Sequence, residues 1–185
     1  MSILVNGLTN HQAPNYRDQA SVLERLAPTV PDLERVRDYW RSIDGVFKET
    51  SPVWTPVEDY TYFAYHGPGG FFVHFGARVA VIVASCRYSA FATMPLLQAA
   101  ILPAFRSVAL ALGGTRLIMM PDDDRALGDA AMYGGASLDE CVELIRKTWG
   151  EPHSPTEETT EDFEAYNRQE TPVWYVEALG KDHSR

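Results

Sequence analysis

The sequence predicts a single α+β domain over residues 1–185, in which helices pack against a mostly antiparallel sheet of about four to six strands. Three observations lead to this prediction. Strand-like apolar runs at 60–66, 71–75 and 78–86 follow one another with only short turns between them. Stretches of helical periodicity lie before and after these runs. The length of 185 residues suits one domain with one substantial core.

The first third of the chain predicts helices before the strands. Residues 2–5 are compatible with a short edge strand, and residues 18–26 with a short helix. Pro31 opens a longer helix that ends near Lys48, because proline is favoured at the first helical position. Its apolar stripe recurs at three- and four-residue steps through Leu33, Val36, Trp40, Ile43 and Phe47.

A hairpin and a buried strand follow. The turn sequence GPGG at 67–70 joins Tyr60–His66 to Phe71–Phe75 as an antiparallel hairpin. The next strand, at 78–86, carries apolar side chains on both of its faces, which is typical of a central strand covered on both sides.

The second half predicts two helices and two strands. Thr93 caps a helix that ends at Gly113-Gly114 and is kinked or split by Pro103. The run TRLIMM then forms a strand that ends at Pro121. Residues 121–136 are predicted to be irregular with one helical turn.

Ser137-Leu-Asp-Glu140 forms a capping box that starts a short helix ending at Gly150. Residues 151–170 have the composition of an irregular, solvated acidic segment. The run PVWYVEAL regains strand character. We expect it to join the sheet and so to order the acidic segment at both ends.

The negative charge is concentrated in one part of the chain. The formal net charge is −9, but residues 121–170 hold 14 of the 25 acids and only four bases, which leaves the other 135 residues at +1. A nucleic-acid binder needs a basic stripe, and none is visible. An acidic surface instead favours a basic protein partner.

The apolar runs, the N-terminus and the cysteines all favour a protein of the cytoplasm. No apolar run approaches the roughly 20 residues needed to cross a bilayer, so we expect no membrane association. The N-terminus lacks the basic region and long apolar run of a secretory signal, which predicts a cytoplasmic protein. The two cysteines, Cys86 and Cys141, give no disulfide framework and are expected to be small buried hydrophobic residues.

Neither a cofactor nor a metal is predicted. The chain has no phosphate loop, and its histidines and cysteines lack zinc-ligand spacing. Asp122, Asp123 and Asp124 follow a strand, where carboxylates can bind Mg²⁺ or Ca²⁺. The calcium-loop spacing is absent, however, so a solvated acidic loop is the favoured interpretation.

One enzymatic alternative remains, a small hydrolase-like enzyme. Cys86 would be the nucleophile and His66 or His74 the base, with Asp122 nearby. The cysteine-phosphatase loop is missing, because Ala92 stands where that loop needs arginine, and no papain-type or Gly-x-Ser-x-Gly context occurs. This hypothesis requires the four side chains to converge in one cleft. A ligand sensor or an assembly subunit is a second alternative.

The favoured hypothesis is a non-catalytic binding protein. Aromatic residues lie on both faces of the strand around Tyr62, and tyrosine and tryptophan are enriched at protein interfaces. An aromatic strip beside acidic residues suits a basic partner. The expected contact residues are Tyr62, Asp122, Asp123, Asp124, Glu157, Glu158, Glu161 and Asp162.

In size, acidity, helix-then-hairpin start and the late segments TWGEP and PVWYVE, the chain resembles the small acidic α+β immunity proteins of bacterial polymorphic toxin systems. This resemblance implies an inhibitor that neutralises a basic toxin acting in the cytosol, for instance on nucleic acid or a nucleotide.

Overall fold

The structure is a computed structural model that describes residues 4–26, 36, 38, 53–57, 63–122, 125–153 and 173–180. The strands are β1 (Leu4–Asn10), β2 (Thr55–Pro56), β3 (Phe63–His66), β4 (Phe71–Phe75), β5 (Val79–Arg87), β6 (Arg116–Pro121) and β7 (Tyr175–Ala178). The helices are α1 (Tyr16–Leu26), α3 (Tyr88–Thr93), α4 (Pro95–Ala111), α5 (Arg125–Met132) and α6 (Leu138–Trp149), with a 3₁₀ turn at Pro68–Gly70.

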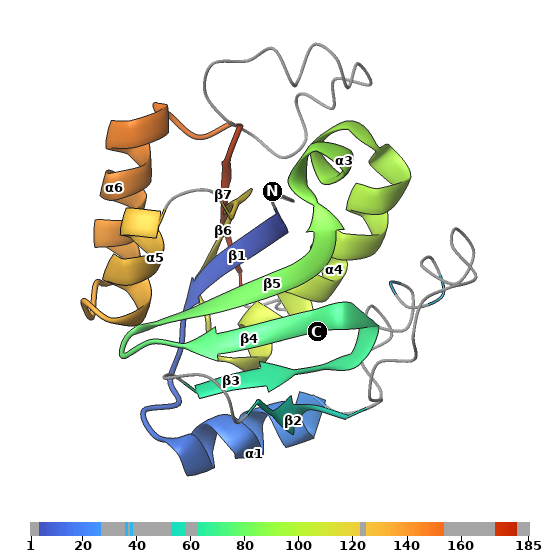
Figure 1. The fold of residues 1–185 in the computed structure, drawn as a ribbon, viewed down its shortest axis with the longest axis vertical. Helices are drawn as coiled ribbons and strands as arrows, with labels where there is room; N and C mark the ends of the chain where they lie inside the picture. The colour runs from blue at the N-terminus through green and yellow to red at the C-terminus, as the bar shows by residue number, and fades with distance from the viewer. Residues whose placement is uncertain are drawn as a thin grey trace.

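The described strands form one antiparallel sheet in the order β2-β3-β4-β5-β1-β6-β7 (Figure 1). This confirms the predicted α+β class and exceeds the expected four to six strands. The strand that the sequence did not predict is β2, which has two residues and lies at one edge of the sheet; the predicted β7, with four residues, lies at the other edge.

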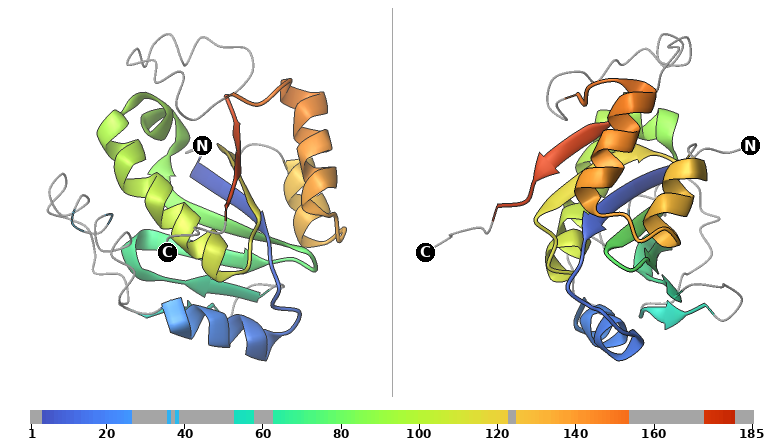
Figure 2. Two further views of the ribbon diagram at one scale, coloured as in Figure 1. Left: turned by 180° about the vertical axis from the view of Figure 1, so that it is seen from behind. Right: turned by 90° about the vertical axis from the view of Figure 1, so that its left-hand side faces the viewer.

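Helices cover the two faces of the sheet unequally. Helix α4 lies behind the sheet in Figure 1 and in front of it in the left view of Figure 2, whereas α5 and α6 lie on the other side, beside β1 and β6. The β5 side chains separate accordingly: Ala80 and Ile82 join the core under α4, and Val79 and Val81 join the core under α5 and α6. The prediction that this strand is covered on both sides is confirmed. In the described part of the chain, no helix covers β3 and β4 on the α5 side.

The N-terminal strand lies at the centre of the sheet, so the prediction of a short edge strand was wrong. β1 pairs with β5 along its whole length and with β6 on its other side. Its polar residues obscured this position. Asn6 and Thr9 are buried, and each bonds to the β6 side of the sheet, Asn6 to Asp122 and Thr9 to the Arg116 carbonyl at 2.8 Å.

The hairpin of β3 and β4 is confirmed over the described residues, with Phe63 opposite Phe75 and His66 opposite Phe72. Residues 60–62 of the predicted strand lie outside the described residues, as does most of the helix predicted at 31–48. Within that helix only Val36 and Asp38 are described. Both are helical, and Val36 is fully buried.

The helices between β5 and β6 differ from the prediction. Thr93 ends α3, where its hydroxyl donates to the Ser89 carbonyl, and α4 begins at Pro95 with Met94 before it. Pro103 lies within α4 without splitting it. The predicted stop at the two glycines is confirmed, since Gly113 has a φ of +82°. The segment expected to contain one helical turn forms the eight-residue α5.

Helix α6 and strand β7 agree with the sequence analysis. Ser137 and Glu140 form the predicted capping box, and β7 adds to the sheet beside β6. The backbone N–H of His153 donates to the Trp174 carbonyl at 2.8 Å, so α6 and β7 are joined by a hydrogen bond between the residues that lie between them in the described chain. No helix among the described residues is long and apolar enough to span a membrane.

Gly7 determines how closely β1 approaches α4, which leads to a prediction about stability. A Cβ atom at Gly7 would lie 2.3 Å from Cδ1 of the fully buried Phe105. We expect Gly7→Ala to lower the free energy of unfolding by about 1–3 kcal/mol, because a packed core resists added volume. Denaturant unfolding measures this change.

The matched control makes the same substitution at Gly128 in α5. A Cβ there meets no heavy atom within 4 Å. Gly128→Ala should therefore stabilise the protein by about 0.5–1 kcal/mol, the usual gain from replacing a glycine inside a helix. Equal effects of the two substitutions would contradict the close-packing argument.

Candidate functional site

A pocket of about 310 Å³ lies between α5 and the sheet. Strands β1, β4, β5 and β6 supply its floor, and α5 with the residue after it supplies its wall. The pocket is lined by Asn6, Leu8, His74, Val81, Val83, Met120, Asp122, Leu127, Gly128, Asp129, Ala131, Met132 and Tyr133. Most of these side chains are apolar, and five residues bring polar groups to the lining.

Asn6 and Asp122 form the polar end of the pocket. The Asn6 side-chain Nδ2 donates to Asp122 Oδ1 at 3.2 Å, and the Asp122 backbone N–H donates to the Leu4 carbonyl at 2.9 Å. The Asn6 side chain is 8 % exposed, and its Oδ1 atom is buried without a hydrogen-bond donor among the described residues. Because Nδ2 must face the carboxylate, Oδ1 is fixed as an acceptor that needs a donor.

His74 enters the pocket from β4, on the face opposite the α4 core. It lies opposite Ala64 and Val81 in the sheet. Burial lowers the pKa of His74 to about 4, so the ring is neutral at pH 7. Its neighbour Phe72 lies between two imidazoles, with ring centroids 4.4 Å from His66 and 6.4 Å from His74. Burial also lowers the pKa of His66.

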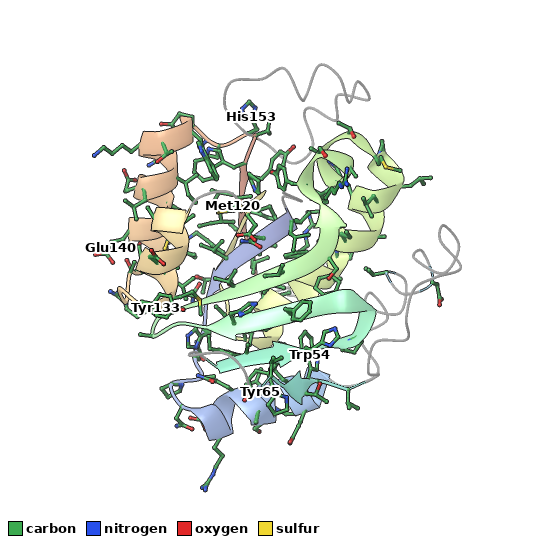
Figure 3. All side chains as sticks on the ribbon, viewed as in Figure 1. Trp54, Tyr65, Met120, Tyr133, Glu140 and His153 are labelled. Carbon is green, nitrogen blue, oxygen red and sulfur yellow. The ribbon has the colours of Figure 1, made fainter. Side chains whose placement is uncertain are left out.

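Helix α5 contributes Asp129 and Tyr133. Tyr133 directly follows the last residue of α5, and its backbone N–H donates to the Asp129 carbonyl at 2.9 Å. Tyr133 is 61 % exposed and lies at the lower end of α5 in Figure 3, near the turn between β4 and β5. The backbone sets this position, because a Cβ atom at Gly76 in that turn would lie 2.3 Å from the Ala131 carbonyl oxygen.

The pocket differs from α6 in its charge balance. The α6 acids pair with arginines: Asp139 with Arg116, Glu143 with Arg146, and Glu140 with Arg78 at 3.6 Å. The pocket lining carries two carboxylates and neither lysine nor arginine among its described residues. Asp122, which is exposed and pairs with no lysine or arginine of the described residues, therefore makes its end of the pocket electronegative.

The four residues of the hydrolase alternative do not converge. Cys86 belongs to the core on the α4 side of the sheet and is 5 % exposed, and burial raises the pKa of its thiol to about 12. His66 and His74 lie together on the other face, and His74 and Asp122 share the pocket. The Asp122 carboxylate is held by Asn6. A thiolate nucleophile activated by these histidines is therefore excluded by the geometry.

Among the predicted contact residues, Asp122 is the one that the structure describes, and it lies in the pocket. Tyr62, Asp123, Asp124, Glu157, Glu158, Glu161 and Asp162 lie outside the described residues. Within the described ranges, no group of three His, Cys, Asp or Glu side chains is arranged to hold a metal ion.

The sequence analysis missed Asn6, Asp129 and Tyr133. A polar residue within an apolar strand, as Asn6 is in LVNGLTN, was a usable signal, because a buried amide requires hydrogen-bond partners. Asp129 and Tyr133 gave no such signal, since α5 was expected to be mostly irregular.

Comparisons of the chain with protein-family models, with curated proteins and with solved structures gave no match. The assignment of function therefore depends on the pocket and the sequence.

The lowered pKa of His74 predicts a pH dependence of stability. The unfolded chain binds more protons than the folded chain between pH 6.5 and about 4, so the free energy of unfolding should fall as the pH falls through this window. The loss is at most about 3 kcal/mol, and less because the ring is only partly buried. Urea unfolding of wild type and His74→Gln at pH 7, 5.5 and 4.5 measures it.

The variant should lose less stability than wild type over this range. His153→Gln, at an exposed position, is the matched control and should follow wild type. Parallel pH curves for wild type and His74→Gln would show that His74 is not the responsible group.

Proposed function

We propose that this protein is a non-catalytic binding protein of the immunity or inhibitor type, which acts in the cytoplasm by neutralising a basic toxin partner. The observation that supports the proposal is the electronegative pocket beside the uncovered face of β3 and β4. Its lining has Asp122 and Asp129 but no lysine or arginine among the described residues. Charge complementarity of this kind speeds association and selects for a basic partner.

The aromatic side chains beside the pocket support the same function. Phe72 and the neutral imidazoles of His66 and His74 form a stacked row on the sheet face that no described helix covers. Aromatic rings provide large contact areas at protein interfaces, and a row flanked by carboxylates combines apolar contact with charge recognition. Asp123, Asp124 and the acids at 157–162 belong to the proposed contact set as well.

The hydrolase-like enzyme remains a weaker second proposal in a changed form. His74 and Asp122 line one pocket, which is the observation in its favour. The proposal no longer includes Cys86, because that thiol lies on the opposite side of the sheet.

The test first asks whether a basic protein copurifies with this chain in equal amount, and that protein is then the candidate partner. Wild type should restore growth to cells that express the partner and should bind it in a one-to-one complex. Asp122→Lys should slow association about tenfold and weaken the rescue, because it reverses a charge in the pocket. Biolayer interferometry at two salt concentrations gives the association rates.

The control is Glu24→Lys on α1, which changes the net charge by the same amount at an exposed position outside the pocket. It should bind as wild type does. If Glu24→Lys and Asp122→Lys slow association equally, only net charge matters and the pocket is not the contact. Asp129→Lys provides a second pocket variant, and thermal unfolding checks that each variant is folded.

A further inference from the structure

We infer that the pocket between α5 and the sheet binds an alkyl guanidinium group, the chemistry of an arginine side chain, with Asp122 as its ion-pairing residue. The inference rests on the proposed function and deepens it, because it names the group of the partner that the pocket receives. It follows from the hydrogen bonds around Asp122, the buried acceptor of Asn6 and the apolar floor.

The carboxylate of Asp122 is held in place before any ligand arrives. Its backbone N–H is bonded to Leu4, and one side-chain oxygen accepts from Asn6. A carboxylate has about four acceptor positions, so most remain available. Asp122 itself is exposed, and no lysine or arginine of the described residues pairs with it. A guanidinium can donate two parallel hydrogen bonds to such a group.

The Asn6 oxygen makes the pocket more suitable for a hydrogen-bond donor than for an acceptor. It is a buried acceptor that has no donor among the described residues, and its orientation is fixed by the bond from Nδ2 to Asp122. Asn6 lines the pocket, so a ligand that brings N–H donors suits its amide oxygen better than a ligand that brings further acceptors. A phosphate or carboxylate ligand would instead bring further acceptors toward the Asn6 oxygen and the Asp122 carboxylate, which disfavours an anion at this end of the pocket.

The remainder of the lining fits the stem of the side chain. Leu8, Val81, Val83 and Met120 form an apolar floor, and the three methylenes of an arginine can lie on such a surface. A guanidinium is more weakly hydrated than an ammonium, so it enters a partly apolar pocket at a lower cost than lysine does. His74 is neutral at pH 7 because burial lowers its pKa, so it does not repel the cation.

A guanidinium group has two possible sources, a free small molecule or an arginine of a protein partner. Chemical shifts in ¹⁵N-labelled full-length protein distinguish them. The probes are N-acetyl-L-arginine methylamide, free L-arginine, the capped lysine analogue and capped citrulline, which keeps the shape of arginine without its charge.

Capped arginine should shift the backbone amides of Asp122 and Gly128 in a saturable manner, with a dissociation constant on the order of millimolar. Capped citrulline and capped lysine should bind about tenfold more weakly, and Asp122→Asn should weaken capped arginine by a similar factor. Glu24→Gln is the matched control and should have no effect. Equal affinity for free and capped arginine, or tighter binding of the capped form, indicates a protein side chain.

Binding of free L-arginine at least a hundredfold more tightly than capped arginine would indicate a small-molecule source and would still support the site. Equal binding of citrulline, equal binding of lysine, or shifts confined to α1 would each overturn the guanidinium assignment.

The proposed function is judged separately. If Asp122→Lys abolishes partner binding while capped arginine fails to bind, the function stands and this inference falls. If capped arginine binds and Asp122→Lys leaves partner association unchanged, the reverse holds.

Discussion

The close contact of β1 with α4 is the constraint on which the rest of the structure depends. Gly7 allows the strand to reach the buried ring of Phe105, and the strand then pairs with β5 and β6 at the middle of the sheet. Because side chains alternate along a strand, the same placement turns Asn6 and Leu8 to the other face. One glycine contact therefore fixes both the α4 core and the floor of the pocket.

The pocket exists because α5 covers this face without filling it. Asn6 lies opposite Met120, so the end of β6 brings Asp122 back to the start of β1, where Leu4 accepts its backbone N–H. Above them, α5 presents the small residues Gly128 and Ala131, and a Cβ atom at Gly128 would meet open space. A larger side chain at Gly128 would occupy volume that is now available to a ligand.

The pattern of apolar residues correctly predicted β4, β5, β6 and α6, whose buried faces are made of apolar side chains. It failed for β1, because Asn6, Gly7, Thr9 and Asn10 obscure a strand whose burial is set by contacts with α4 and β6. For the candidate site, the sequence supplied Asp122 and His74 as separate candidates, but the sheet order that brings them to one pocket is a property of long-range pairing. Asn6, in particular, acquires its chemistry from a bond to a residue 116 positions away.

Most of the net charge lies outside the residues that line the pocket. The described residues hold ten acids and nine bases, so they carry −1 of the total −9, and the remaining residues carry −8. The α6 acids are largely neutralised by arginines, whereas no lysine or arginine of the described residues pairs with Asp122 in the pocket. The described residues on either side of 154–172 are held by the His153 bond to Trp174, by Tyr88 donating to Val173 at 2.5 Å and by Trp174 donating to Gly150 at 3.1 Å. Long-range attraction of a basic protein depends on total charge and weakens with salt, but the choice of one side chain over another depends on fixed acceptors in a partly apolar site. On the proposed function, attraction of the partner and choice of the bound side chain would therefore depend on different residues.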